Sequence, residues 1–131
     1  MMSFGLEGKY YRIAACRIDG DSAEFDVVLL ADYEVYKGHF PGNPVCPAVC
    51  HIGMLRECVA KLVKRNLFVS SVKKCRLTAM ATPESCPCLK LSVELHEAAR
   101  GLEVHARLYD SERTYMVYAG EMAFACETLQ L

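Results

Sequence analysis

Two stretches in the second half of the chain alternate strictly between apolar and polar side chains, and this pattern constrains the fold most. The first runs from Leu89 to His96 and the second from Leu102 to Leu108. Successive side chains of a β-strand point to opposite faces, so the alternation predicts strands with one buried and one solvated face. Such strands are typical of antiparallel sheets. The connections at 97–101 and 110–113 then indicate hairpins.

Further strands are predicted before this pair and after it. Ala23 to Leu30 begins with the same alternation, and three segments alternate less cleanly: Tyr10 to Ile18, Val69 to Leu77 and Thr114 to Cys126. The pattern therefore predicts six strands in chain order.

One segment, from about Pro47 to Arg65, has helical periodicity instead. Its apolar residues recur at spacings of three, four and seven and cover most of the helix surface. Proline suits the first helical turn, and Lys61 and Lys64 complement the helix dipole near the end. A helix that is apolar on most sides is best buried by wrapping the sheet around it. The sequence predicts an α+β fold, a mainly antiparallel sheet around one long central helix, in a single domain over residues 1–131.

The composition limits the class of protein. Hydrophobic residues make up 53% of the 131 residues, and the formal net charge is −1. Soluble domains average roughly 45–50%, so the excess points to a membrane span, a large interface or an apolar ligand tunnel. The apolar runs are shorter than the roughly 18 residues that a span needs. The near-neutral charge argues against nucleic-acid binding. The first residues show no secretory signal pattern, so we expect a cytoplasmic protein.

The eight cysteines are predicted to be free thiols. Their spacing contains no Cys-x-x-Cys pair of the zinc type. Cys58 and Cys126 lie within apolar patterns, where a thiol packs as a small hydrophobe. Reduced thiols fit the cytosol. A metal site formed by Cys46, Cys50 and His51 is the weaker alternative, and we expect no metal and no cofactor.

The most informative segment directly precedes the helix and reads Gly38-His39-Phe40-Pro41-Gly42-Asn43-Pro44-Val45-Cys46-Pro47-Ala48-Val49. Three prolines and two glycines make a rigid loop that can hold the His39 imidazole beside a helix N-terminus. The unpaired N–H groups of such a terminus can polarise a carbonyl oxygen. Histidine suits proton transfer near neutral pH.

This segment resembles the signature of β-hydroxyacyl-(acyl carrier protein) dehydratases of the FabA/FabZ type, which have the hot-dog fold. That signature is His-Phe-Pro-Gly-x-Pro-Val-x-Pro-Gly-Val before a long helix, and residues 39–49 match it except at its second glycine, which is Ala48. The order of strands and helix fits over about residues 8–127. The resemblance implies that His39 removes the proton alpha to the thioester carbonyl. It also implies that the Ala48 N–H binds that carbonyl and that Val49 lines the mouth of the acyl tunnel.

The resemblance also implies a substrate and an assembly. The substrate would be an acyl thioester on acyl carrier protein or CoA, and the chain would form a homodimer with acyl tunnels along the interface, higher oligomers being left open. The substrate-binding residues would be Phe40, Pro41, Gly42, Pro47, Ala48, Val49 and Gly53. Two basic groups are candidates to receive an acidic carrier protein, with a plain solvated surface as the equal alternative: Lys73, Lys74 and Arg76, and Lys61, Lys64 and Arg65.

The chain departs from the family at the second catalytic group, a helix Glu or Asp fourteen residues after the histidine. That position is Gly53 here, and losing a general acid typically costs ~10²–10⁴ in rate. In one interpretation Glu57, one turn further on the same face, supplies the carboxylate; a solvated surface glutamate is the alternative. In a second, Gly53 widens the tunnel for a bulky aryl or polyenoyl chain. In a third, the protein binds acyl thioesters without dehydrating them.

The remaining candidates are weaker. His51 is a candidate substitute acid, although a structural or surface histidine is favoured. His96 and His105 fall on the polar faces of their strands and are expected to be solvated. Asn43 is expected to shape the turn rather than to bind substrate.

The sequence thus predicts a 3-hydroxyacyl-(acyl carrier protein) dehydratase-like protein. It would give the trans-2-enoyl thioester in fatty acid or related polyene biosynthesis, with His39 and Glu57 as catalytic residues. The alternatives are a non-catalytic acyl-thioester-binding partner subunit that has lost the helix carboxylate and, less favoured, a hot-dog thioesterase.

Overall fold

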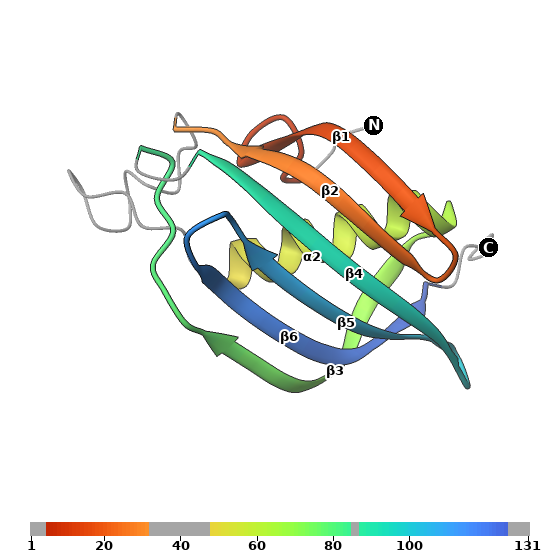
Figure 1. Cartoon of the computed structure of the whole chain (residues 1–131). Helices are drawn as coiled ribbons and strands as arrows, with labels where there is room; N and C mark the ends of the chain where they lie inside the picture. The colour runs from red at the N-terminus through yellow and green to blue at the C-terminus, as the bar shows by residue number, and fades with distance from the viewer. Residues whose placement is uncertain (1–4, 32–47, 85–86, 126–131) are drawn as a thin grey trace.

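The alternating segments form a six-stranded sheet in the computed structural model, which describes residues 5–31, 48–84 and 87–125 (Figure 1). The elements are β1 (Tyr11–Asp19), β2 (Ser22–Leu29), α2 (Ala48–Val63), β3 (Leu67–Leu77), β4 (Cys88–Ala98), β5 (Gly101–Tyr109) and β6 (Thr114–Phe124). The strand order is β1-β2-β4-β5-β6-β3, and every neighbouring pair is antiparallel. Helix α2 lies against one face of the sheet (Figure 1). The predicted antiparallel sheet with a helix packed against it is confirmed and is consistent with a hot-dog fold.

The two cleanly alternating segments are neighbouring strands. On β4, Leu91 and Val93 are buried, whereas Lys90 is exposed. Leu91 lies opposite Leu108 of β5, so apolar side chains of the two strands share the face that packs on α2. The connection between them is shorter than the predicted 97–101, because β4 extends to Ala98 and pairs there with the first residue of β5.

Helix α2 is shorter than the sequence predicts. It contains 16 residues, Ala48–Val63, and is therefore about 24 Å long. Lys64 has a left-handed backbone conformation with φ of 58°, and the Arg65 N–H bonds to the Ala60 carbonyl oxygen at 3.3 Å. This geometry closes a helix C-terminus. The predicted end at Arg65 and the description of the helix as long were therefore wrong; the predicted start at Pro47 lies outside the described residues.

The hydrophobic core lies between α2 and the inner face of the sheet. The buried helix residues are Cys50, His51, Met54, Leu55, Cys58 and Val59. Strand residues that meet them from the sheet include Phe25, Leu91, Val104, Leu108, Met116 and Met122. No helix in the described part of the chain is long and apolar enough to cross a membrane. Since the sheet covers one side of α2, the opposite side of the helix is left for other contacts.

Candidate functional site

The candidate site is built at the start of α2. Ala48 is the first helical residue of the described chain, and the Val49 side chain is 74% exposed. N–H groups in the first turn of a helix have no intrahelical acceptor, so they are available to an external one. The other predicted loop residues, His39, Phe40, Pro41, Gly42 and Pro47, lie outside the described residues, and their roles stay predictions.

Four residues at a spacing of four form one stripe of α2, which we call the outer stripe: Val49, Gly53, Glu57 and Lys61. None of the four is among the buried residues of the helix that face the core. Three of the predicted site residues, Val49, Gly53 and Glu57, therefore share one side of α2.

Residues 5–10, which we call the N-terminal strap, cover part of the outer stripe. An ideal Cβ built at Gly53 would lie 2.7 Å from Cδ1 of Leu6, closer than real Cβ contacts allow. Leu6 is partly buried and packs against the core. In the single chain, the room that Gly53 leaves is thus filled by Leu6. Whether Gly53 also widens an acyl tunnel stays a prediction.

The Glu57 carboxylate anchors this strap. Its Oε2 accepts the Leu6 N–H at 2.7 Å, and its Oε1 accepts the Glu7 N–H and the Tyr11 hydroxyl, each at 3.0 Å. The Arg56 guanidinium lies 3.6 Å away, and the Glu57 side chain is only 14% exposed. The alternative of a solvated surface glutamate does not describe this residue. The three hydrogen bonds show that the Glu57 carboxylate holds the strap against α2. Its catalytic role stays a prediction.

The strap is held at further points. Lys61 donates from Nζ to Glu7 at 2.9 Å. Within the strap, the Leu6 carbonyl oxygen accepts the N–H groups of Lys9 at 2.9 Å and Tyr10 at 2.8 Å. Gly8 has φ of 86°, a conformation that favours glycine and allows this tight turn. The strap is therefore an ordered turn.

His51 lies beneath the strap in the core. Its side chain is 2% exposed, and its Nδ1 lies 2.8 Å from the Tyr10 hydroxyl. Burial lowers the pKa of His51 to about 4, so the imidazole is neutral at pH 7. Of the favoured alternatives, a structural or a surface histidine, this burial confirms the structural one. A neutral imidazole with so low a pKa is a poor substitute for the missing acid.

The polar face of the sheet carries the other two predicted histidines. His96 lies 3.1 Å from Glu94, His105 lies 3.6 Å from Glu103, and both imidazoles are 47% exposed. The prediction that they are solvated is confirmed.

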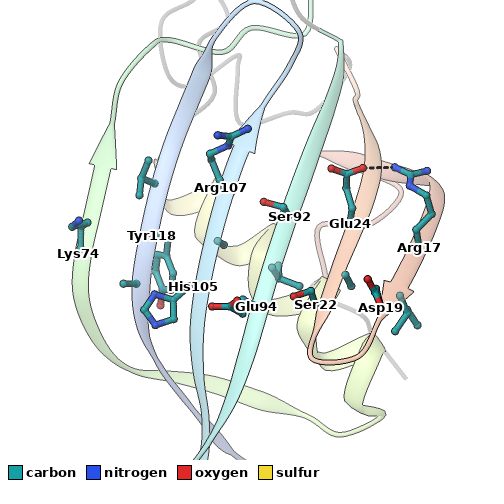
Figure 2. A pocket seen from close by; sticks show the side chains of 16 residues that line it. Arg17, Asp19, Ser22, Glu24, Lys74, Ser92, Glu94, His105, Arg107 and Tyr118 are labelled. Carbon is teal, nitrogen blue, oxygen red and sulfur yellow. Dashed lines mark hydrogen bonds and ion pairs between the residues drawn. The ribbon is translucent and has the colours of Figure 1, made fainter.

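A shallow cavity of about 660 Å³ crosses this polar face, lined by residues of all six strands (Figure 2). In it Arg17 donates to Glu24 at 2.8 Å. The lining side chains carry both signs of charge, among them Lys74, Glu94 and Arg107, so the cavity has no single ligand chemistry.

No disulfide forms among the described cysteines. Cys16, Cys50, Cys58, Cys75 and Cys88 are free thiols, as predicted. Within residues 5–31, 48–84 and 87–125, no group of three His, Cys, Asp or Glu side chains is placed to hold a metal ion. The remaining thiols, Cys46 among them, lie outside these ranges.

Sequence reasoning missed the strap. Leu6, Glu7 and Tyr11 contact Gly53 or Glu57 across about fifty residues of chain. The one available signal was Gly53 itself, because a glycine inside a helix costs ~1 kcal/mol against alanine and indicates close packing nearby.

The sheet and its helix define a hot-dog-like domain. Comparison with protein families identifies the family to which this domain belongs. Residues 15–117 match the model of the ApeI-like family, described as ApeI dehydratase. Because this match spans most of the chain, the protein belongs to the ApeI-like dehydratase family. The finer assignment to the FabA/FabZ type stays a prediction. Comparison with curated proteins gives no match.

The fold also resembles that of solved structures. The dehydratase heterocomplex ApeI:P from Xenorhabdus doucetiae superposes with a TM-score of 0.68 at 18% identity, over 85% of this chain and 96% of that chain. An uncharacterised protein from Erwinia carotovora subsp. atroseptica gives a TM-score of 0.58 at 14% identity, over 88% and 95% of the two chains. At these identities the similarity establishes the fold alone.

Proposed function

We propose that this protein is a cytoplasmic dehydratase that eliminates water from a 3-hydroxyacyl thioester to give the trans-2-enoyl thioester. The observation that carries the proposal is the family match over residues 15–117, a range that contains both the histidine loop and α2. The resemblance of residues 39–49 to the FabA/FabZ signature supports the same chemistry. We propose acyl carrier protein as the carrier, with CoA as the alternative.

In the proposed reaction His39 takes the proton from the carbon alpha to the thioester carbonyl. The bond between carbon 3 and its hydroxyl oxygen breaks, and the hydroxyl leaves as water after receiving a proton. The Ala48 N–H binds the thioester carbonyl oxygen and stabilises the charge that develops there. The position of Ala48 at the start of α2, where N–H groups lack intrahelical acceptors, supports this role. Phe40, Pro41, Gly42, Pro47 and Val49 would line the substrate.

A dehydratase needs a group that donates a proton to the leaving hydroxyl, whereas a non-catalytic acyl-binding subunit does not. Gly53 has no side chain to donate it, and the Glu57 carboxylate already accepts three hydrogen bonds. If neither position supplies the proton, the chain is a non-catalytic acyl-binding subunit that acts beside an active partner. The structurally similar ApeI:P assembly is a dehydratase heterocomplex, which supports a partner of this kind.

The assembly is proposed to use the edge strand β3. Within the described residues β3 pairs on one side only, with β6, and it exposes Phe68, Val72 and Leu77 by 51%, 48% and 50%. Exposed apolar groups on an unpaired strand edge favour association with another chain. We propose a second copy as that chain, with a related subunit as the alternative.

The test is direct. Purified protein is incubated with 3-hydroxyacyl thioesters of short, long and aryl chains, on carrier protein and on CoA, and the product is examined by mass spectrometry for loss of water. We expect the enoyl product, and we expect His39→Ala to abolish it. His105→Ala, at an exposed histidine on the far face of the sheet, is the matched control and should retain activity. Absence of product from every substrate would refute the enzyme, and release of free thiol would indicate a thioesterase.

A further inference from the structure

The outer stripe of α2 is open at one end and covered at the other. Val49 is 74% exposed, whereas the next residue of the stripe, Gly53, lies under the Leu6 side chain. Residues four apart on a helix are separated by about 6 Å along its axis. An apolar ligand that follows the stripe from the start of the helix therefore meets Leu6 after about one turn.

Both backbone polar groups of Leu6, the N–H and the carbonyl oxygen, form hydrogen bonds that hold it in this position. Its N–H donates to Glu57 at 2.7 Å, and its carbonyl oxygen accepts two N–H groups within the strap. Glu57 also accepts the Tyr11 hydroxyl, and Tyr11 pairs with Leu29 in the sheet. The strap is thus tied to the helix and to β1, so Leu6 is a fixed obstacle.

We propose that Leu6 is the end wall of the acyl site and sets the largest acyl group that the site admits. The inference rests on the proposed function, because it takes the acyl chain to enter beside Val49. Gly53 provides the seat of the Leu6 side chain. Glu57 and Lys61 are positioning residues, since they hold the strap and touch the ligand only through Leu6.

The test measures binding of non-hydrolysable acyl-pantetheine amides, graded from butanoyl to dodecanoyl and including a cinnamoyl group. Leu6→Ala should shift the preferred length upward, with about a tenfold gain in relative affinity for a chain two methylenes longer. Leu6→Phe should shift it downward by a similar factor. Opposite shifts from the two variants cannot come from a general loss of stability.

The control is Leu102→Ala, the same change at another partly buried leucine, which lies near the last turn of α2. It should leave the length preference unchanged. The wall is refuted if both Leu6 variants keep the wild-type preference, or if wild type binds none of the amides. A length-graded affinity that responds to Leu6, in a protein that forms no enoyl product, would support the wall and refute the dehydratase, so the two failures are distinguishable.

Discussion

At Gly53 two effects oppose each other within one residue. Replacing glycine by alanine inside a helix stabilises by ~1 kcal/mol, but the new Cβ would lie 2.7 Å from the flexible end of Leu6. We expect Gly53→Ala to change the free energy of unfolding by less than about 1 kcal/mol in wild type and to raise it by about 1 kcal/mol in a Leu6→Ala background. Urea unfolding of the four proteins measures both values. An equal gain in the two backgrounds would show that the two side chains do not compete for this space.

Gly53→Glu, which introduces the carboxylate that the resemblance to the FabA/FabZ type implies at this position, is subject to the same conflict. The new side chain would need the room that Leu6 fills, and it would stand one turn from the Glu57 carboxylate. We therefore expect Gly53→Glu alone to leave dehydration no faster than in wild type. Steady-state rates on the best substrate of wild type check this. A large gain in rate would mean that the strap yields and that the site has merely lost its acid.

Glu57 concentrates the strap's hydrogen bonds in one carboxylate. Glu57→Gln removes the charge that three donors share, and hydrogen bonds to charged groups contribute about 1.5–3 kcal/mol each. We expect a loss of about 2 kcal/mol in the free energy of unfolding and faster hydrogen exchange at the Leu6 and Glu7 amides. Glu94→Gln, at an exposed pair with His96, should cost less than about 1 kcal/mol. Unchanged exchange at the two strap amides would argue against the anchor.

At the scale of elements, the contact between the strap and α2 introduces a pH dependence through His51. Burial lowers its pKa from 6.5 to about 4, so between these values the unfolded chain binds a proton that the folded chain does not. The free energy of unfolding should therefore fall as pH falls from about 6.5 to about 4, by roughly 3 kcal/mol, and this contribution should level off below that range. Urea unfolding at a series of pH values measures the slope.

Two variants separate burial from hydrogen bonding in this effect. His51→Gln should remove the His51 contribution to the slope, because no imidazole is then left at this buried position. Tyr10→Phe should retain most of it, because burial rather than the Tyr10 hydroxyl lowers the pKa. A slope that survives in His51→Gln would place its origin in other groups.

The elements also show which parts of the fold are readable from sequence. β4 and β5 were predicted to within two residues because each buries one face, which imposes a period of two. β3 alternates less cleanly because its pairing with β6 shifts between Val69 and Ser71 and again between Val72 and Lys74. The end of α2 was missed because Lys64, which is not a glycine, takes the left-handed conformation.

The candidate site was readable only in part. The spacing of four correctly placed Gly53 and Glu57 on one side of the helix. The segment that covers that side is held by contacts between residues about fifty positions apart. Residues 5–10 have no periodic pattern from which these contacts could be predicted. Local periodicity reports which face of an element is apolar, but not which distant segment packs on the other face.

At the scale of the whole molecule, the sheet ends in two unlike edges. β1 exposes one large apolar side chain, Ile18, whereas β3 exposes several along its length. By register, Val72 and Leu77 lie opposite Gly120 and Met116, residues of β6 that are buried, so they continue the inner, apolar face of the sheet to its edge.

Within the described residues, a buried hydroxyl group without a hydrogen-bond partner also lies near the β3 edge. The Tyr118 hydroxyl of β6 is buried and, in the part of the chain that the structure describes, has no hydrogen-bond partner. Tyr118 lies opposite Cys75 of β3. A buried hydroxyl without a partner costs about 1–3 kcal/mol. A small rearrangement of β3 on association that gave the Tyr118 hydroxyl a partner would therefore stabilise the complex. Apolar exposure and an unsatisfied group thus coincide at this edge.

We therefore expect the interface of the proposed homodimer to form along β3. Charged side chains in place of both Val72 and Leu77 should convert a dimer to a monomer, because two copies would then bury like charges against each other. Val72→Lys/Leu77→Lys is compared with Ile18→Lys, which places the same charge at the β1 edge, and mass in solution is measured by light scattering over a range of concentrations. A dimer that survives the β3 double variant but dissociates with Ile18→Lys would move the interface to β1. A wild-type chain that stays monomeric at every concentration, yet gains mass when a related subunit is added, would replace the second copy by a different partner at the same edge.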